Sequence, residues 1–238
     1  MKAGDFITVQ EDDGQWHTIR ILAIDVWPDG SECFHCTCYE PTPERPRADA
    51  LETLDVLVYH APIDAEDFKT RWSVLHSSPP TDADMSGFFE YLKHTDFPRY
   101  IEVSGQDLSE VIALANAAYR EACALGDKKQ PQQAIPLYER AFDLFPLFYE
   151  AIDNRAFSFM ELGDYATALA GFEHSLQVNP EGEAAIFSRG ECLLKLGRLD
   201  EAEAVFLEGA QRPGGNQAMF QRFLATTKDL RKQAARGQ

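Results

Sequence analysis

The sequence predicts an α+β protein with several domains: a small antiparallel β-barrel-like domain, then an α-solenoid of three helical hairpins that ends in a C-terminal capping helix. Two observations support this prediction. In the second half of the chain, small and aromatic residues recur every 34 residues, as at Gly163 and Gly197, and such a period is typical of stacked helical hairpins. Over residues 1–61, apolar and polar residues instead alternate in short runs between turn residues, as in antiparallel strands.

The N-terminal block, residues 1–61, is predicted to contain four strands at residues 6–9, 16–27, 32–40 and 54–59. Pro28, Asp29 and Gly30 form a hairpin signal between the second and third strands. Because the connections are short, we expect an antiparallel meander. It is similar, at the level of pattern only, to a small open barrel of the SH3-like or Tudor-like kind.

Residues 62–106 are predicted to be a packed connecting region rather than a free linker. Its aromatic residues Trp72, Phe97 and Tyr100 carry large apolar surfaces that need burial. Thr81 is expected to cap a short helix that follows it, after the loop marked by Pro79 and Pro80.

Residues 107–216 are predicted to form three hairpin repeats, each of which buries its apolar face only by stacking on its neighbours. Small residues are expected where paired helices approach closely, glycine where the first helix ends, and proline after the second helix. Asp107, three residues before Glu110, predicts a capped start of the array. The recurring slots contain Ala122, Ala156 and Gly190; Ala134, Ala168 and Ala202; Tyr138, Phe172 and Phe206; and Pro146 and Pro180.

These slots resemble the tetratricopeptide repeat (TPR) family over roughly residues 109–235. The first unit diverges most, because Lys129 replaces the turn glycine and Pro131 replaces the aromatic residue after it. The resemblance implies an array that binds other proteins and has no chemistry of its own. The clearest match is the middle unit, which contains Asn154-Arg155-Ala156, Leu162-Gly163-Asp164-Tyr165, Ala168, Phe172 and Asn179-Pro180.

Residues 217–238 are predicted to form the helix that caps the array. Phe220, Phe223, Leu224 and Leu230 fall on one helical face, and the basic residues mostly avoid that face. A terminal repeat needs such a cover for its last apolar surface. The alternative is a basic amphipathic helix that binds an acidic partner or a membrane surface.

The resemblance also implies that the first helix of each repeat lines a binding groove. Steps of 34 residues place aromatic side chains and carboxylates on these first helices. Such a groove suits a protein or peptide segment with basic and apolar residues. The alternative is that part of this set packs against the connecting region or the N-terminal domain. The predicted partner-binding residues are Asn116, Tyr119, Cys123, Asp127, Glu150, Asp153, Asn154, Phe157, Glu161, Phe187 and Glu191.

One subtype of the family, the co-chaperones, grips acidic C-terminal peptides with a clamp of lysine, arginine and asparagine. Of the clamp positions, only Asn154 matches here. Tyr119 and Cys123 replace a basic residue and an asparagine. Ala184 and Ser188 replace two further basic residues. The sequence therefore disfavours a chaperone-tail clamp.

The chain is strongly acidic, with a formal net charge of −17 over 238 residues. Residues 1–106 contain 8 Lys+Arg and 20 Asp+Glu, whereas residues 217–238 contain 5 and 1. A negative field repels phosphate backbones, so no nucleic-acid partner is expected. No run of apolar residues reaches the length of a membrane span, and the N-terminus lacks the pattern of a signal peptide. We therefore expect no membrane association and a cytoplasmic location.

The sequence shows none of the common enzyme motifs, such as a nucleophile elbow or a phosphate-binding glycine loop, and no cofactor or metal is predicted. Cys33 and Cys36 have the Cys-x2-Cys spacing of zinc sites. On a strand, however, they point to opposite faces, whereas Cys36 and Cys38 share a face. His35 lies in the same segment, and His60 joins it only if the fold brings the two together.

The sequence thus predicts a non-enzymatic protein-binding module with an adaptor, chaperone-like or inhibitor role. Two alternatives remain open at this point. In the first, the β domain is the recognition module, with Trp16, Trp27, Phe34 and Tyr39 as its contact residues, and the repeats are a scaffold. In the second, residues 33–38 bind a metal and support redox or hydrolytic chemistry.

Overall fold

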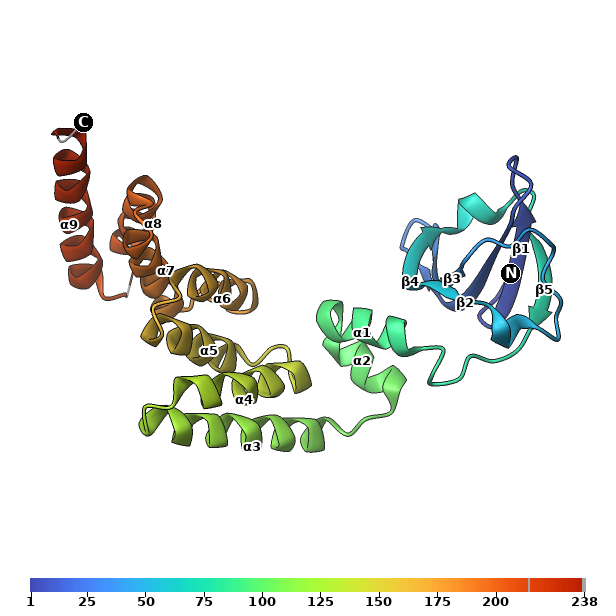
Figure 1. Cartoon of the computed structure of the whole chain (residues 1–238), viewed down its shortest axis with the longest axis horizontal. Helices are drawn as coiled ribbons and strands as arrows, with labels where there is room; N and C mark the ends of the chain where they lie inside the picture. Colours follow the sequence, from blue (N-terminus) through green and yellow to red (C-terminus); the bar gives the residue numbers. More distant parts are fainter. Residues whose placement is uncertain (214, 237–238) are drawn as a thin grey trace. The chain divides into compact units, whose positions relative to one another are not determined.

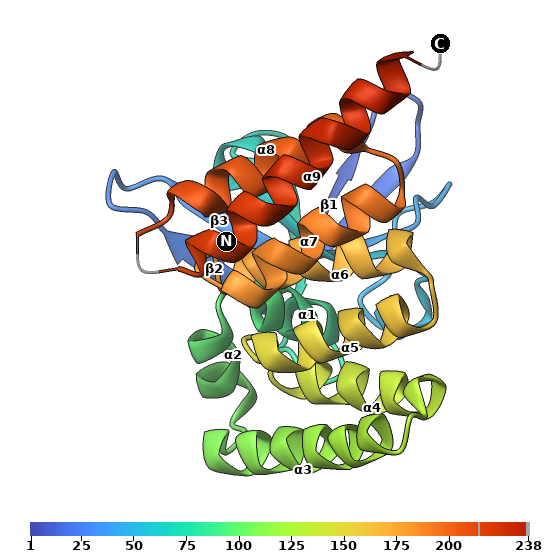
Figure 2. The same cartoon turned by 90° about the vertical axis from the view of Figure 1, so that its left-hand side faces the viewer.

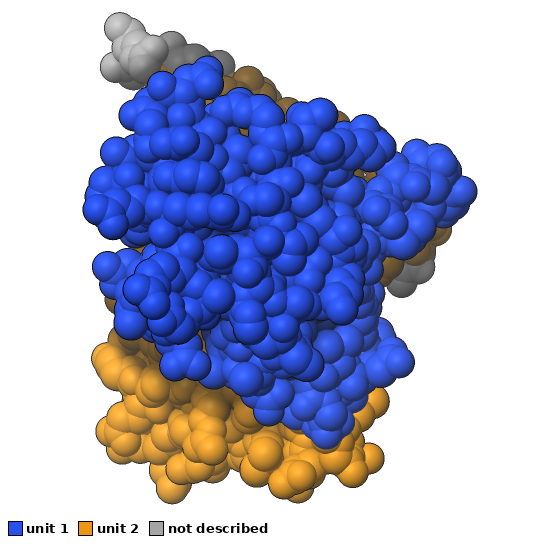
Figure 3. All heavy atoms as spheres, turned by 90° about the vertical axis from the view of Figure 1, so that its right-hand side faces the viewer, with its two compact units in different colours: residues 1–106 blue, residues 107–238 orange. Residues whose placement is uncertain are grey.

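A computed structural model describes residues 1–213 and 215–236 of the chain. The chain divides into two compact units, Met1–Gln106 and Asp107–Gln238, which we call unit 1 and unit 2. Figure 1 labels their elements, and Figure 3 colours the units separately. Residues 237 and 238 of the predicted capping helix, and Gly214 at the end of the third repeat, lie outside the described residues.

Unit 1 is built on one antiparallel sheet with strand order β4-β3-β2-β1-β5 (Figure 1). Strands β1 to β4 pair in sequence order, which confirms the predicted meander, and β5 adds to the free side of β1. The strands are β1 Asp5–Gln10, β2 Trp16–Val26, β3 Glu32–Tyr39, β4 Val56–Asp64 and β5 Ser73–Ser77, with the 3-10 turns η1 Leu51–Thr53 and η2 Ala65–Phe68.

The segment from residue 62 to 106 contains more regular structure than the sequence analysis predicted. It holds the end of β4, all of β5, and the helices α1 Ser86–Thr95 and α2 Phe97–Ser104. Strand β5 escaped prediction because it is short and mostly exposed, so it has no clear apolar alternation. The prediction for Thr81 is wrong: its hydroxyl donates to Asp84 over 2.6 Å in the preceding turn, and Met85 is the N-cap of α1.

The aromatic residues of this segment are packed within unit 1. The ring of Trp72 lies 5.2 Å from that of Phe68 in η2. Phe97 is buried, and its ring lies 5.7 Å from that of Tyr100. Their apolar surfaces therefore add to the core of unit 1, as the sequence suggests.

The two faces of the sheet differ in chemistry. One face forms the main apolar core, where Ile7, Ile21 and Phe34 pack against Phe68. We call the other face the polar face. It is partly covered by α1, where Phe88 and Leu92 pack against Leu22 of β2. Because directly paired residues point the same way, the register places a set of buried polar side chains on this face. They are Thr8, Thr18, Arg20 and Thr37.

Unit 2 is a stack of helices in which each helix packs against the next one along the chain (Figure 2). The helices pair into three hairpins, α3 with α4, α5 with α6 and α7 with α8, followed by α9. None of the helices among the described residues has the length and apolar character needed to cross a membrane. The bounds are α3 Leu108–Asp127, α4 Pro131–Leu144, α5 Tyr149–Glu161, α6 Tyr165–Val178, α7 Glu183–Lys195, α8 Leu199–Gln211 and α9 Gln217–Arg236.

The residues of the 34-residue slots have the predicted roles. Asp107 caps α3, because its Oδ1 accepts a hydrogen bond from the backbone of Ser109 over 2.7 Å. Gly163 and Gly197 end the first helices of their hairpins with φ angles of +78° and +73°. Lys129 adopts the same left-handed conformation, with φ +58°, so the divergent first repeat keeps the turn without its glycine. The small residues Ala134, Ala168 and Ala202 are fully buried.

Helix α9 covers the apolar end of the last hairpin, as predicted for a cap. Phe220 is 1% exposed, and Phe223 lies 4.7 Å from the ring of Phe187 on α7. On the outer side, Arg231 pairs with Asp200 and Glu203 of α8. An aromatic contact and a charged contact therefore both hold α9 to the array.

Candidate functional site

A polar cluster joins α3 and α5 among the predicted binding residues. Asn154 Nδ2 donates to the Tyr119 hydroxyl over 2.9 Å and lies 3.9 Å from Cys123 Sγ. The Tyr138 hydroxyl of α4 donates to the same sulfur over 3.6 Å. Burial raises the pKa of Tyr119 to about 12, so its hydroxyl stays protonated at neutral pH. Three predicted residues from two repeats thus meet in one place.

Two carboxylates on α5 lie beside this cluster. Glu150 is half-buried and close enough to act on both Tyr119 and Asp153. Asp153 is 9% exposed, and its Oδ1 has no hydrogen-bond partner among the described residues. Burial raises the pKa of the Asp153 carboxyl, the nearby Ser175 hydroxyl opposes the shift, and the charge of Glu150 adds to it.

Glu191 on α7 is a third carboxylate of this kind. It is half-buried, and burial raises the pKa of its carboxyl although the positive charge of Lys195 opposes the shift. It occupies the same repeat slot as Phe157 and Cys123. Within the described part of the chain, no lysine, arginine or histidine lies within 4 Å of Glu150, Asp153 or Glu191.

The other half-buried carboxylates of unit 2 do have partners. Glu139 pairs with Arg155 over 2.8 Å, and Glu203 pairs with Arg231. Glu183 accepts a hydrogen bond from the backbone of Asn216 over 2.6 Å. We call Glu150, Asp153 and Glu191 the unpaired acids, because none of them forms an ion pair with another described residue. All three lie on the first helices of their repeats.

Two of the three aromatic residues in the predicted set contribute to the core of the array. Phe157 is partly buried, with its ring 5.0 Å from that of Phe172. Phe187 is packed beneath α9, with its ring 5.6 Å from that of Phe220. Part of the predicted set therefore packs within the helical array itself.

Among the described residues, the remaining predicted ones form no hydrogen bond with the cluster, although the charge of Asp127 acts on Tyr138. Asn116 Nδ2 donates to the Ile112 carbonyl of its own helix over 3.0 Å. Glu161 is exposed and pairs with Lys129 over 3.7 Å. Asp127 is exposed. We therefore centre the candidate site on Tyr119, Cys123, Asn154 and the unpaired acids.

The aromatic residues of the first alternative do not form one surface. Phe34 and Tyr39 are buried on opposite faces of the sheet, where Phe34 stacks on Phe68 at 5.5 Å. Trp27 is 55% exposed beside the hairpin turn. Trp16 lies under the guanidinium of Arg45, at 5.3 Å from its ring. Two of the four residues are thus unavailable to a protein partner.

Of the cysteines of the second alternative, Cys36 is buried, and Cys33 and Cys38 are half-buried. Cys36 and Cys38 pack on the same apolar core, and all five cysteines are free. Burial raises the pKa of both thiols, which keeps them protonated and disfavours metal binding. The described residues contain no group of three or more His, Cys, Asp or Glu placed to hold a metal ion.

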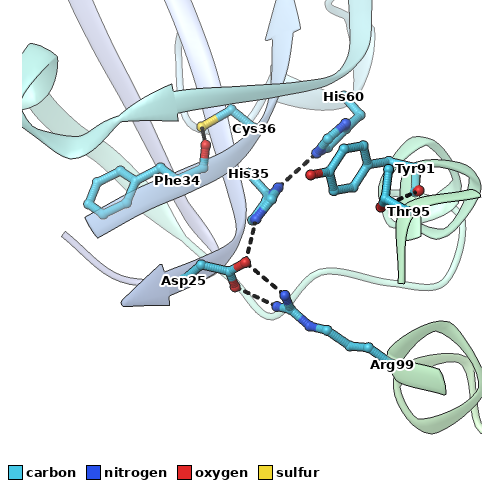
Figure 4. Close-up of polar contacts among 8 residues, drawn as sticks. All are labelled: Asp25, Phe34, His35, Cys36, His60, Tyr91, Thr95 and Arg99. Atoms are coloured by element: carbon cyan, nitrogen blue, oxygen red, sulfur yellow. Dashed lines mark hydrogen bonds and ion pairs between the residues drawn. The ribbon is translucent and has the colours of Figure 1, made fainter. Parts of the chain in front are cut away.

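Unit 1 contains a polar network that the sequence analysis missed (Figure 4). His35 Nδ1 lies 2.9 Å from His60 Nε2, and His35 Nε2 lies 3.1 Å from Asp25 Oδ2. Arg99 of α2 donates to both carboxylate oxygens of Asp25, over 2.7 and 2.5 Å. The ring of Tyr91 on α1 lies 4.5 Å from that of His60. The network therefore joins three strands to α1 and α2.

The protonation of the network follows from its surroundings. The hydrogen bonds from Arg99 lower the pKa of Asp25 to about 2, so it is a carboxylate at neutral pH. Burial and the neighbouring His35 lower the pKa of His60 to about 4, so His60 is neutral. His35 Nε2 donates to the Asp25 carboxylate, whereas the direction of the His35–His60 hydrogen bond depends on the tautomers of the two rings.

We expect unit 1 to lose stability as the pH falls from 6.5 to 4. The unfolded chain protonates His60 near pH 6.5, whereas the folded unit resists protonation until about pH 4. The contribution of His60 to the free energy of unfolding is therefore complete above pH 6.5. It falls by about 2 kcal/mol between pH 6.5 and 4, after allowance for solvent screening of this half-buried ring. Urea unfolding followed by tryptophan fluorescence measures it, because Trp16, Trp27 and Trp72 all lie in unit 1.

The His60→Gln variant should flatten this pH dependence, since glutamine keeps a donor and does not titrate. His94→Gln, at an exposed histidine of α1, is the control and should keep the slope of the parent protein. An unchanged slope in His60→Gln would contradict the assignment.

Comparison with known proteins gives one family match and several similar structures. The tetratricopeptide repeat family model matches residues 154–216. Among solved structures, the chain is similar to the TPR domain of Sgt2 from Aspergillus fumigatus, with 26% identity, a TM-score of 0.46, and coverage of 51% of this chain and 82% of that one.

Two further similar structures are the OM64 TPR domain of Arabidopsis and the Yersinia enterocolitica type III secretion chaperone SycD in complex with a peptide of the translocator YopD. The first has 20% identity and a TM-score of 0.46, over 50% of this chain and 98% of that one. The second has 17% identity and a TM-score of 0.46, over 49% and 93%. The match identifies residues 154–216 as tetratricopeptide repeats, and the chain adds an antiparallel β unit at its N-terminus.

Proposed function

We propose that unit 2 is a non-enzymatic binding module that holds a segment of another protein with basic and apolar side chains. The proposal rests on the unpaired acids Glu150, Asp153 and Glu191. Because the pKa values of Asp153 and Glu191 are raised, their ionised forms cost stability in the free protein at neutral pH. A lysine or arginine of a partner supplies the missing cation and offsets this cost.

The neutral groups of the cluster suit the backbone of such a segment. Tyr119 and Asn154 offer hydroxyl and amide groups that can exchange hydrogen bonds with peptide groups. An acidic segment would instead meet like charges at the unpaired acids. Ser188, one of the four positions at which the co-chaperone clamp is not matched, is 3% exposed. We therefore propose a basic segment as the partner rather than an acidic tail.

Reversal of two unpaired acids should weaken partner capture. We choose the double variant Glu150→Lys with Glu191→Lys, because both side chains are half-buried and not fully enclosed. Reversal of Asp153 would bury a lysine and test folding instead. The affinity for a partner purified by affinity capture should fall about tenfold, and binding by the parent protein should weaken with added salt. Titration calorimetry at two salt concentrations measures both effects.

The matched control is Asp143→Lys with Glu173→Lys, two exposed acids on the second helices α4 and α6. It changes the net charge by the same amount and should leave the affinity within about twofold of the parent value. Equal weakening in both double variants would assign the effect to overall charge and refute the site. Capture should also weaken on acidification, starting at a higher pH than an ordinary carboxyl would give, because ionised Asp153 and Glu191 are the binding forms.

A further inference from the structure

Strand β4 is a terminal strand of the sheet in unit 1 and pairs on one side with β3 (Figure 1). Along a regular strand, successive side chains point to opposite faces of the sheet. β4 departs from this alternation, because its register with β3 shifts between Cys36 and Cys38 and again between Cys38 and Tyr39. Such bulges turn side chains in new directions. Three consecutive apolar side chains of β4, which we call the β4 patch, are exposed: Leu57 by 53%, Val58 by 40% and Tyr59 by 63%.

The β4 patch lacks the usual protection of an exposed strand edge. Proteins shield such edges with lysine or proline, but β4 contains no lysine, and its one proline, Pro62, lies beyond the patch. Helix α1 meets β4 at the backbone of Tyr59, next to Gly87, and at the ring of His60, next to Tyr91, and leaves the patch exposed. A run of three exposed apolar residues is unfavourable unless it has a function. The patch therefore has the character of a contact surface.

The surroundings of the β4 patch are acidic. Asp55 directly precedes β4, and its carbonyl accepts a hydrogen bond from the backbone of Glu40 over 2.9 Å. Glu52 lies in η1, just before the strand. All three side chains are exposed, and none of them forms an ion pair with another described residue.

The charge of the whole unit has the same sign. Residues 1–106 contain 20 Asp+Glu against 8 Lys+Arg. A field of this sign attracts a basic segment, whereas it repels an anionic lipid surface and a second copy of the same unit. Charge complementarity therefore favours a basic partner for the β4 patch.

We propose that the β4 patch binds an extended segment of another protein in which basic residues flank apolar ones. An extended segment suits an edge strand, because its backbone can pair with the free side of β4. Its apolar side chains pack on the patch, and its lysine or arginine side chains lie near Glu40, Glu52 and Asp55. The site lies entirely in unit 1, and it does not depend on the function proposed for unit 2.

The test uses NMR of the full-length protein labelled with 15N, because backbone amide signals show where a peptide binds. The probe is the acetylated peptide amide Lys-Val-Leu-Val-Lys. It should shift the signals of residues 56–60 with a Kd of about 0.1–1 mM, as expected for a contact of a few residues. Two comparison peptides, Glu-Val-Leu-Val-Glu and Lys-Ser-Gly-Ser-Lys, should each bind at least about tenfold more weakly, because one reverses the charge and the other lacks the apolar side chains.

A variant of the patch locates the binding. Leu57→Ser with Tyr59→Ser removes two exposed apolar side chains and should weaken binding of the lysine peptide at least about tenfold. The matched control is Val26→Ser with Val74→Ser, at two exposed apolar residues of β2 and β5 outside the patch, and it should bind normally. Tryptophan fluorescence shows whether unit 1 is folded in each variant.

A second variant tests the charge and keeps the patch intact. Glu40→Gln with Asp55→Asn, at two exposed residues, should weaken binding of the lysine peptide about threefold and reduce its salt dependence. If the serine variant of the patch does not fold, this variant decides, and unchanged binding would overturn the proposal.

The same spectra separate this site from the one proposed for unit 2. Glu150→Lys with Glu191→Lys should leave the peptide-induced shifts of residues 56–60 unchanged, whether or not unit 2 binds its own partner. Loss of these shifts in that variant would contradict the independence of the two sites and overturn the proposal.

Other occupants of the patch would give different results. Sedimentation velocity should show no dimer that the serine variant of the patch abolishes, and vesicles of phosphatidylserine should not bind through the patch. Either kind of patch-dependent binding would overturn the proposal. Two further results would also overturn it: no shift of residues 56–60 up to about 5 mM lysine peptide, or equal binding of the glutamate peptide.

Discussion

Replacement of Asp25 by asparagine is expected to lower the free energy of unfolding of unit 1 by about 2–3 kcal/mol, the range for charge-assisted hydrogen bonds that lose an ionised partner. Asp25 accepts two hydrogen bonds from Arg99 and one from His35. Asparagine has a single acceptor oxygen, and its amide would face a donor. Urea unfolding followed by the fluorescence of the three tryptophans of unit 1 measures the change.

The pH dependence of this contribution provides a second readout. The pKa of Asp25 is about 2 in the folded protein, below its ordinary value of 3.8. A lowered pKa means that the stabilisation is complete above pH 4 and is lost as the pH falls from 4 to 2. The Asp25→Asn variant should lack this part of the acid profile.

Asp67→Asn, at an exposed aspartate of η2, is the control and should stay within about 0.5 kcal/mol of the parent protein. The double variant of Asp25→Asn with Arg99→Gln should lose less than the sum of the two single losses, by at least about 1 kcal/mol. Additive losses would show that Asp25 and Arg99 do not act as a pair.

Gly209→Ala is expected to destabilise unit 2 although alanine is the better helix former. A Cβ atom at Gly209 would overlap the ring of Phe220, a buried residue of α9 that packs against the last hairpin. The ring cannot move without opening the packing of α9, so we expect a net loss of about 2 kcal/mol after the gain in helix propensity. Unfolding followed by circular dichroism measures the loss, and faster tryptic cleavage in α9 would locate it.

Gly126→Ala on α3 is the matched control, because a Cβ there meets only the Tyr138 hydroxyl at 3.6 Å, an ordinary contact. It should stabilise the protein by about 0.5–1 kcal/mol through helix propensity alone. The two substitutions are chemically identical and have opposite expected signs. A stabilising Gly209→Ala would show that α9 is not packed as described.

The repeat architecture could be predicted because each slot has a local cause. A buried alanine such as Ala168, or a left-handed turn at Gly163, is required by the geometry within one hairpin and recurs in the next. The four strands of the meander could be predicted for the same reason, because the alternation of apolar and polar residues is a local pattern. Strand β5 has no such local pattern, since its side chains are mostly exposed and its pairing with β1 depends on a distant segment.

The candidate site could be predicted only in part. The 34-residue step placed Tyr119, Cys123 and Asn154 on facing helices, and the structure brings them together. The same step cannot show that α9 covers Phe187, because that contact comes from outside the repeat. The network of Asp25, His35 and Arg99 depends on strand register and on the packing of α2, so no spacing in the sequence signals it.

The aromatic contacts between α9 and the last hairpin close the end of the array. A chain shortened before Gln217 would leave the rings of Phe187 and Phe206 without the cover that Phe220 and Phe223 supply. Exposed rings at the end of a solenoid invite end-to-end association between copies. Any shortened or chimaeric version of this protein must therefore keep α9, or replace it with another helix that covers these rings, to avoid such association.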